Sequence, residues 1–439
     1  MKRLLILMLC SLWSLAAVAV PPIETWETEN GAKVLFMAAR DLPMVDARVT
    51  FRAGSARDGD LPGLARLTNA VLVEGAAGIP GQALFQRLED VGAEFSNGSY
   101  RDMALLSLRV LSDPQPLQAA SEVIAAMLTQ PDFPAAAVAR DRAALLAAVQ
   151  ARAESARALA DVKVFETLYA GHPYAHPPGG TEASLRAMTR TDLIAFHRRY
   201  YVARNAVVAL VGDLDRRQAE ALAEKLVGGL SAGDRAPSLP PPRSLERRAP
   251  IHISYSGTQS HVSLTGVGVG HGDPDRQALT VGNHLLGGNG LVSLLSEKLR
   301  GELGLTYSVS SRFMAMSAPG PFRMSLQTRA DQADAALAAM REVLDAFMDT
   351  PPDPEQVAQT KQNLTGGFAL EIAGNAALLG QLSYIGFYDY PLDWLDTYID
   401  RVNAVTPTQI QDAFRRRVDR GALLTIVVGP EPTGDKAEE

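Results

Sequence analysis

A repeat of a whole segment, and not of a short unit, most constrains how this chain can fold. Each copy begins with a Thr-x-Thr pair, continues through a double arginine, and ends in a six-residue apolar run followed by glycine. The copies cover residues 189–212 and 406–429. A repeat separated by more than 200 residues cannot be a solenoid, so it predicts two homologous domains in the 439 residues.

Apolar periodicity predicts strands and helices in both halves. In the first half we expect strands at 33–37, 47–51, 103–111 and 206–211, and helices at 61–75, 81–91, 115–128, 134–169 and 189–200. In the second half we expect strands at 251–255, 261–269, 305–310 and 322–328, and helices at 276–286, 291–300, 331–347 and 354–370. The mixture predicts an α+β fold. It would consist of two homologous sandwich domains, each an antiparallel-rich sheet with helices on one face, joined by a linker as a clamshell.

Composition changes sharply at 231–249, where proline and charge dominate and no periodicity survives. We interpret this stretch as a linker between a first domain at 20–230 and a second domain at 250–432. Residues 433–439 are predicted to be a disordered tail.

The first 19 residues have the pattern of an export signal. Lys2 and Arg3 precede an apolar run that ends at Ala17-Val18-Ala19, an acceptable cleavage site. Cleavage removes Cys10, the only cysteine, so the mature protein would have no disulfide. We therefore predict a periplasmic protein with no stable membrane span after cleavage, and an uncleaved anchor is the alternative.

Net charge argues against one class of partner. Loss of Lys2 and Arg3 takes the formal charge from −7 to −9, with 40 basic against 49 acidic residues. Such mild acidity is unlike that of nucleic-acid-binding proteins, so no nucleic-acid partner is expected.

The helix predicted at 61–75 has two distinct faces. Its apolar residues recur with the spacing of a single buried stripe: Leu64, Leu67, Val71 and Leu72. Arg66, Asn69 and Ala70 share the opposite face at positions i, i+3 and i+4.

This helix and the segments FRAGS at 51–55, HPY at 172–174 and LRGELGLTYSV at 299–309 closely resemble the insulinase/pitrilysin-type zinc metallopeptidases. The resemblance extends from about residue 25 to residue 430. It implies that the helix face should carry an inverted H-x-x-E-H motif whose glutamate activates water. Arg66, Asn69 and Ala70 occupy those positions here, and Ala148 falls about where the family has a distant glutamate ligand.

These replacements predict that the chain binds no zinc of its own. A catalytic zinc needs about three N or O ligands and an open position, and a protonated arginine repels a dication. No histidine precedes His172, so a small shift of register cannot restore the site. His172 and His176 have the i, i+4 spacing of a helical metal site, but Pro173 and Pro177 favour a turn in which a histidine packs.

Arg300 and Tyr307 match a pair that, by the resemblance, faces the zinc across the cavity and holds the substrate carbonyl. A fixed cation and a phenol hydroxyl can stabilise an oxyanion, so we predict substrate binding at this pair. Two structural alternatives stay open. Leu305, Tyr307 and Val309 share one face of a predicted strand that could be core, and Arg300 could cap its helix.

Two further segments are weaker candidates for contact with a peptide backbone. Gly287, Gly288, Asn289 and Gly290 allow close approach, although a helix-ending turn explains them equally. Residues 96–104, with Asp102, resemble loosely the family's substrate-side edge strand, where a peptide would bind by strand addition.

The resemblance is to the non-catalytic subunit of a two-chain peptidase. It implies a heterodimer in which a homologous partner carries the zinc and this chain binds and positions the peptide substrate. The alternatives are a pseudo-peptidase that acts as a peptide-binding or scaffold protein without a role in proteolysis, and a self-sufficient zinc enzyme, which the missing ligands disfavour.

Overall fold

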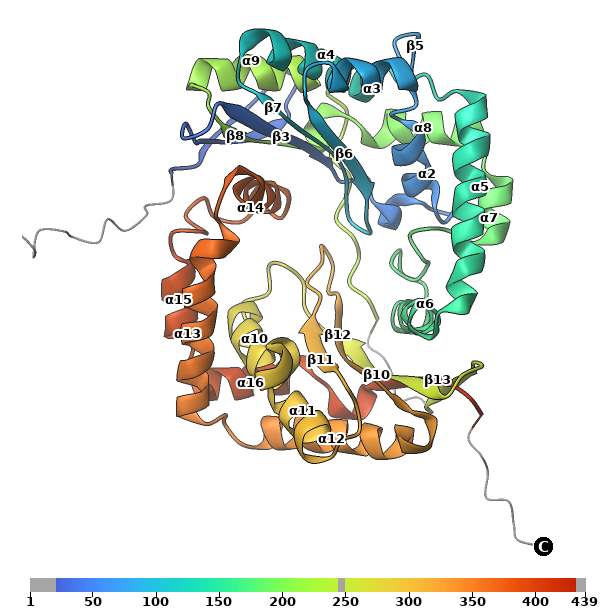
Figure 1. The fold of residues 1–439 in the computed structure, drawn as a ribbon, viewed down its shortest axis with the longest axis vertical. Helices are drawn as coiled ribbons and strands as arrows, with labels where there is room; N and C mark the ends of the chain where they lie inside the picture. The colour runs from blue at the N-terminus through green and yellow to red at the C-terminus, as the bar shows by residue number, and fades with distance from the viewer. Residues whose placement is uncertain (1–20, 244–248, 432–439) are drawn as a thin grey trace, which may run out of the picture.

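The structure, a computed structural model, describes residues 21–243 and 249–431. These residues form two halves that lie one above the other (Figure 1). The predicted signal peptide at 1–19 and the predicted tail at 433–439 lie outside the described residues. Within them, no helix combines the length and the apolar character needed to cross a bilayer.

The first half is built on a six-stranded sheet with the order β1-β2-β8-β3-β7-β6. Its strands are β1 (Glu24–Glu27), β2 (Lys33–Ala38), β3 (Met44–Phe51), β6 (Glu94–Ser99), β7 (Ala104–Leu111) and β8 (Ala206–Gly212). Neighbours pair antiparallel except β2 and β8, which are parallel. Every residue of β8 is buried, because both faces of this central strand are covered.

The second half repeats this arrangement in a five-stranded sheet with the order β11-β12-β10-β13-β9. Its strands are β9 (Ile251–Ser254), β10 (Gln259–Val267), β11 (Val309–Phe313), β12 (Pro321–Arg329) and β13 (Leu424–Gly429). Like β8, β13 pairs parallel on one side and antiparallel on the other. The strands predicted from the sequence repeat thus occupy equivalent places, and the predicted α+β fold of two homologous domains is confirmed.

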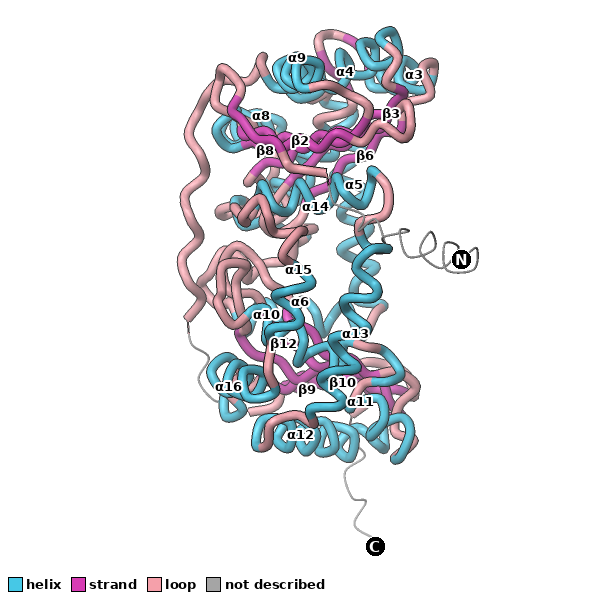
Figure 2. Tube along the Cα trace, turned by 90° about the vertical axis from the view of Figure 1, so that its left-hand side faces the viewer, coloured by secondary structure: helices cyan, strands magenta, loops and turns pink. Residues whose placement is uncertain are grey.

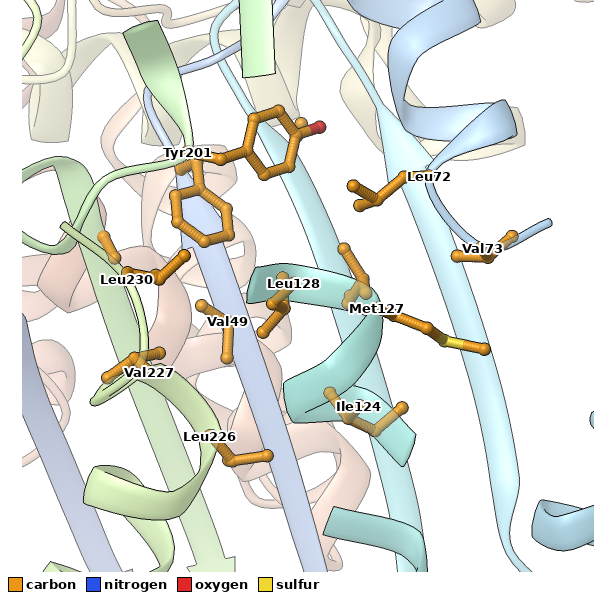
Figure 3. Close-up of a cluster of buried hydrophobic side chains, with 14 of the residues drawn as sticks. Val49, Leu72, Val73, Ile124, Met127, Leu128, Tyr201, Leu226, Val227 and Leu230 are labelled. Atoms are coloured by element: carbon orange, nitrogen blue, oxygen red, sulfur yellow. The ribbon is translucent and has the colours of Figure 1, made fainter. Parts of the chain in front are cut away.

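Each sheet packs its own helices on one face. The first half has α2 (Leu64–Val71), α3 (Gly81–Glu89), α4 (Pro114–Thr129), α7 (Glu182–Ala187), α8 (Arg190–Tyr200) and α9 (Arg216–Val227). The second half has α10 (Arg276–Asn283), α11 (Leu294–Ser296), α12 (Ala333–Asp349), α15 (Tyr398–Ala404) and α16 (Pro407–Arg417). Figure 3 shows part of the first core, where Val49 of β3 lies between Leu128 of α4 and Val227 of α9. Removing these apolar side chains from water supplies the main stabilisation of each half.

The opposite face of each sheet is covered by a helix from the other half. Helix α14 (Asn375–Phe387), from the second half, packs Leu382 and Ile385 against Leu35 and Val207 of the first sheet. Helix α6 (Ala156–Leu168), from the first half, packs against β13 of the second sheet. In Figure 1, α5 (Ala135–Ala151) and α13 (Pro354–Glu371) run between the halves on opposite sides and lead to these exchanged helices. The sequence predicted helices on one face of each sheet. That prediction is right for the helices of the same half, but the other face of each sheet is covered by a helix from the opposite half.

Two predicted elements differ in the structure. The helix expected at 134–169 is interrupted at residues 152–155, and α6 starts anew because the Ser155 hydroxyl accepts a hydrogen bond from the Ala158 N–H. The strand expected at 305–310 begins only at Val309. Ahead of it, α10 and α11 each continue into a short π-helical turn, at 284–288 and 297–302.

The linker between the halves is fixed along its first part. Residues 231–243 contain no helix or strand and run along the outside of the molecule as the long loop in Figure 2. The Ala236 N–H donates to the side chain of Asn205, and the Pro240 carbonyl lies 2.8 Å from His172 Nε2. These contacts attach the linker to the first half.

Candidate functional site

Helix α2 is anchored at its N-terminal end by a buried aspartate and a glycine. The Asp58 carboxylate accepts hydrogen bonds from the backbone N–H groups of Gly63 and Ala65, both at 2.7 Å. Burial raises the pKa of Asp58 to about 8, although these two hydrogen bonds act in the opposite direction. Gly63 has φ of 96°, and a Cβ there would lie 2.9 Å from Gly180. The helix is thereby fixed against the loop that carries Gly180.

The three side chains at the expected metal positions differ in how far they are exposed to solvent. Arg66 is exposed, Ala70 is half-buried and Asn69 is only 3% exposed. The Asn69 side-chain oxygen accepts a hydrogen bond from Asn97 Nδ2 at 3.0 Å, and its amide nitrogen lies 3.4 Å from the Tyr201 hydroxyl. Asn69, although it lies opposite the apolar stripe of α2, is therefore part of a buried network that joins α2 to β6.

A cavity of about 470 Å³ lies beside α2 and is lined by both halves. Arg66 of α2 and Ala148 of α5 both line it, so the structure brings together two of the expected metal positions. Its second-half wall comes from β11 and β12. Five arginines line it: Arg66, Arg101, Arg152, Arg312 and Arg323. Asp161 is the single acidic residue in the lining.

Two of the arginines hold the cavity wall in place. The Arg101 guanidinium lies 3.5 Å from the centre of the Phe165 ring and donates to the carbonyls of Tyr174 and His176. Burial lowers the pKa of Arg101 to about 10, so it stays charged at neutral pH. Arg152 donates to the Gly180 carbonyl at 2.9 Å.

Arg323 forms an ion pair with the single acidic side chain in the cavity lining. It forms an ion pair with Asp161 and donates to the Ser263 hydroxyl at 2.7 Å. Its guanidinium also lies 3.2 Å from His261 Nε2. Burial, with the charge of Arg323, lowers the pKa of His261 to about 4, so this histidine is neutral at pH 7. The remaining arginines of the cavity have no carboxylate in its lining.

The residues at this place do not fit a zinc ion. Zinc takes thiolate, imidazole or carboxylate ligands, whereas Arg66, Ala70 and Ala148 offer none of these and Asn69 is engaged elsewhere. In the described ranges, no group of three or more His, Cys, Asp or Glu residues is placed to hold a metal. The surrounding arginines would repel a dication.

The pair His172 and His176 lies in a turn, as predicted from the neighbouring prolines. His172 is buried with both ring nitrogens engaged, since Nδ1 accepts from the Tyr174 N–H at 3.0 Å and Nε2 lies 2.8 Å from the Pro240 carbonyl. The ring also packs edge-on against Tyr174. His172 therefore serves packing between the turn and the linker.

Arg300 and Tyr307 lie together at the surface of the second half. The Arg300 guanidinium is 4.8 Å from the centre of the Tyr307 ring, and Tyr307 is 82% exposed. Tyr307 precedes β11, so the alternative that it lies buried on a strand face is wrong. Arg300 lies within the turn 297–302. Neither residue lines the cavity beside α2.

The glycine cluster that precedes this region has a packing role. A Cβ on Gly287 would lie 2.6 Å from the Ser311 backbone nitrogen of β11, so glycine is required for this close approach. Gly288 and Asn289 end the π-helical turn, and Gly290 has φ of 51°. Their contact with a peptide stays a prediction.

The predicted edge strand contains a residue whose role the sequence did not reveal. β6 is the outermost strand of its sheet, and Asp102 lies in the turn after it. The Asp102 carboxylate, 8% exposed, accepts hydrogen bonds from the Tyr174 hydroxyl, the Ser317 N–H and the Tyr388 hydroxyl. Two of these donors belong to the second half. Asp102 thus bonds the halves together, and Tyr174 in the HPY segment was the only sequence signal for this contact.

A second cavity, of about 610 Å³, lies next to Asp102 and is lined in part by the linker. Arg52, Arg57 and Arg235 line it, but Asp389 pairs with Arg52 at 3.2 Å and with Arg235. Arg57 donates to the Pro237 carbonyl at 2.6 Å. Each of these charges has a partner, so this cavity is an element of the junction between the halves.

Protein-family models and solved structures match this chain over most of its length. Residues 33–182 match the insulinase family (peptidase family M16), and residues 187–364 match the peptidase M16 inactive domain. The crystal structure of a peptidase M16 inactive domain from Pseudomonas fluorescens is 37% identical, with a TM-score of 0.91 over 95% of this chain and 100% of that chain. A protease from Helicobacter pylori, 18% identical, has the same fold, with a TM-score of 0.85 over 94% of this chain and all of its own.

Curated relatives include both peptidases and a subunit of a larger complex. A protein named uncharacterized zinc protease from Streptomyces coelicolor is 26% identical over 355 residues, which is 78% of this chain and 75% of that protein. Subunit 1 of the mitochondrial cytochrome b-c1 complex of Bos taurus is 27% identical over 276 residues. That match covers 62% of this chain and 57% of the bovine subunit.

Proposed function

The chain belongs to the insulinase family of peptidases (family M16), and we propose that it is a non-catalytic subunit that positions peptide for a zinc-carrying homologue. The observation that carries this proposal is the face of α2. Arg66 and Ala70 supply no metal ligand, and Asn69 is bonded within a buried network. Zinc and the activated water would then come from the partner, and the peptide contacts from this chain.

The second half supplies the groups that would contact the substrate. Arg300 and Tyr307 are within cation–π distance, and Tyr307 is largely exposed. In this proposal the guanidinium and the phenol hydroxyl donate hydrogen bonds to the scissile carbonyl as it acquires negative charge at the partner's metal. The setting would be the periplasm, on the strength of the signal pattern at 1–19.

The position of the same pair also favours a second candidate, a peptide-binding or scaffold protein without a role in proteolysis. Arg300 and Tyr307 stack on each other outside the cavity beside α2. In a scaffold protein, Arg300 and Tyr307 would contribute to a contact with another protein, and no peptidase partner would be needed.

Reconstitution distinguishes the two candidates. The purified chain is mixed with the zinc-binding homologue from the same organism, and cleavage of an unfolded peptide is followed with and without a zinc chelator. We expect chelator-sensitive cleavage at least tenfold faster than that of the homologue alone. No gain at any mixing ratio would contradict the proposed function and support the scaffold reading.

A further inference from the structure

The arginine-lined cavity beside α2 has five guanidinium groups and one carboxylate in its lining. We propose that it binds an acidic, extended segment of a peptide, with carboxylates at the arginines and apolar side chains between them. This inference rests on the proposed function and names its substrate class: peptides that carry Asp or Glu next to apolar residues.

The charge balance of the cavity is strongly positive. Five arginines face one carboxylate, and Asp161 is already paired with Arg323. Within the described ranges 21–243 and 249–431, the guanidinium groups of Arg66 and Arg312 form no hydrogen bond or ion pair. Both side chains can therefore bind a ligand without giving up a contact within the protein. A guanidinium binds a carboxylate through two parallel N–H donors, so arginine suits this recognition better than lysine.

The arginines also repel one another within each wall of the cavity. Burial, and then the charge of Arg66, lowers the pKa of Arg152. Burial, and then the charge of Arg323, lowers the pKa of Arg312 in the opposite wall. A bound anion would relieve this repulsion in both walls, whereas a metal cation would add to it. The position that the family uses for a dication is here suited to the opposite charge.

The other walls indicate a peptide and not a small inorganic anion. Leu145 of α5, Val162 of α6 and Met314 after β11 line the same cavity. Its volume of about 470 Å³ is ample for a few side chains of a ligand. An extended strand places successive side chains on opposite sides, so alternating acidic and apolar residues can meet both kinds of wall.

Calorimetric titration of the full chain with three unlabelled peptides tests the proposal. One peptide alternates Glu and Leu over ten residues, and the others replace every Glu by Gln or by Lys. We expect the Glu peptide to bind at least tenfold more tightly than the Gln peptide, the Lys peptide not to bind, and added salt to weaken binding. Arg66→Gln and Arg312→Gln should each weaken binding of the Glu peptide about tenfold.

Arg217→Gln is the matched control, because Arg217 is an exposed arginine on α9, on the helical face of the first sheet and away from the cavity. It should leave the affinity unchanged, and thermal unfolding checks that all three variants fold. Equal binding of the Glu and Gln peptides would overturn the inference. So would unchanged affinity in both cavity variants, or inorganic phosphate binding as tightly as the Glu peptide.

The titration and the cleavage assay together separate this inference from the proposed function. Charge-selective binding without any stimulation of a zinc-binding homologue would support the acidic-peptide site and contradict the subunit role. Stimulated cleavage of a neutral peptide, with no preference for the Glu peptide, would overturn the site and leave the subunit role standing.

Discussion

The two halves share a strand order but differ in where their chemically important side chains lie. In the first half Asn69 is bonded inside the protein and Arg66 lines a cationic cavity. In the second half Arg300 and Tyr307 stack at the surface, where Tyr307 is 82% exposed. The first half thus has a buried amide and an arginine-lined cavity at this place, while the second half has a half-buried guanidinium beside an exposed phenol. The difference teaches that homologous domains of one chain can place their polar side chains in quite different surroundings.

The largest effect expected from this comparison concerns activity. Arg300→Ala should reduce partner-stimulated cleavage of a neutral peptide about a hundredfold, the usual cost of removing one donor to a developing oxyanion. Its free energy of unfolding should change by less than about 0.5 kcal/mol, since a surface side chain is removed. Initial rates and urea denaturation measure the two quantities.

The matching change in the first half is the control. Arg66→Ala should leave cleavage of the neutral peptide within about twofold, because Arg66 is placed to meet acidic ligands. If Arg66→Ala costs as much as Arg300→Ala, the proposed difference between the halves is wrong.

The next effect concerns the helices exchanged between the halves. Leu382→Ala should lower the free energy of unfolding by about 2–5 kcal/mol, since Leu382 is fully buried against the first sheet. Leu370→Ala, at an 80% exposed position on α13, should change it by less than about 0.5 kcal/mol. Urea unfolding followed by circular dichroism should show one shared transition. Separate transitions for the halves would show that they are independent.

Acid should weaken both halves in the same pH window. Burial is the main cause that lowers the pKa of His197 in the first half and of His261 in the second, each to about 4. The unfolded chain takes up these protons near pH 6.5, so stability is fully present above pH 6.5 and falls as the pH drops towards 4. At ~1.4 kcal/mol per pKa unit, each histidine contributes on the order of 3 kcal/mol to this loss.

Thermal unfolding measured between pH 7 and pH 4 checks the acid effect. His197→Gln should flatten the dependence, because its side chain cannot become charged. A pH dependence that is identical in His197→Gln and in the unaltered chain would contradict the assignment of a neutral, buried His197.

The smallest expected effects are on the free energy of unfolding, and they distinguish Asn69 from Tyr307. Asn69→Ala should cost about 1 kcal/mol, since it removes hydrogen-bond partners of Asn97 and Tyr201 in a buried network. Tyr307→Ala should cost less than about 0.5 kcal/mol, since its ring is exposed. A larger loss for Tyr307→Ala would place this residue in the core and weaken its proposed role.

Local patterns in the sequence predicted most of the fold. Apolar runs identified β2, β3 and β8, and the repeat matched β8 to the segment that forms β13. The break at Ser155 was missed because the flanking alanines all favour helix, and one side-chain cap decides where α6 begins. Strand β11, which follows Tyr307, was predicted to begin four residues too early, because Leu305 and Tyr307 continue its alternation without pairing.

The candidate site was only partly predictable. The loss of ligands at Arg66, Asn69 and Ala70 follows from residue types, and so does the arrangement of His172 in a turn. The approach of Arg312 and Arg323 to Arg66 does not follow, because it depends on β11 and β12 facing α5 and α6 across the two halves. Contacts between segments this far apart depend on tertiary packing, which no local pattern encodes.

The exchange of α6 and α14 has a consequence for how the protein is made. A ribosome releases the first sheet long before residues 375–387, so Leu35 and Val207 stay open to water on one side until almost the whole polypeptide has emerged. During that interval this apolar face of the first sheet is a surface to which a chaperone can bind. A chain truncated before α14 would leave this face of the first sheet permanently exposed to water.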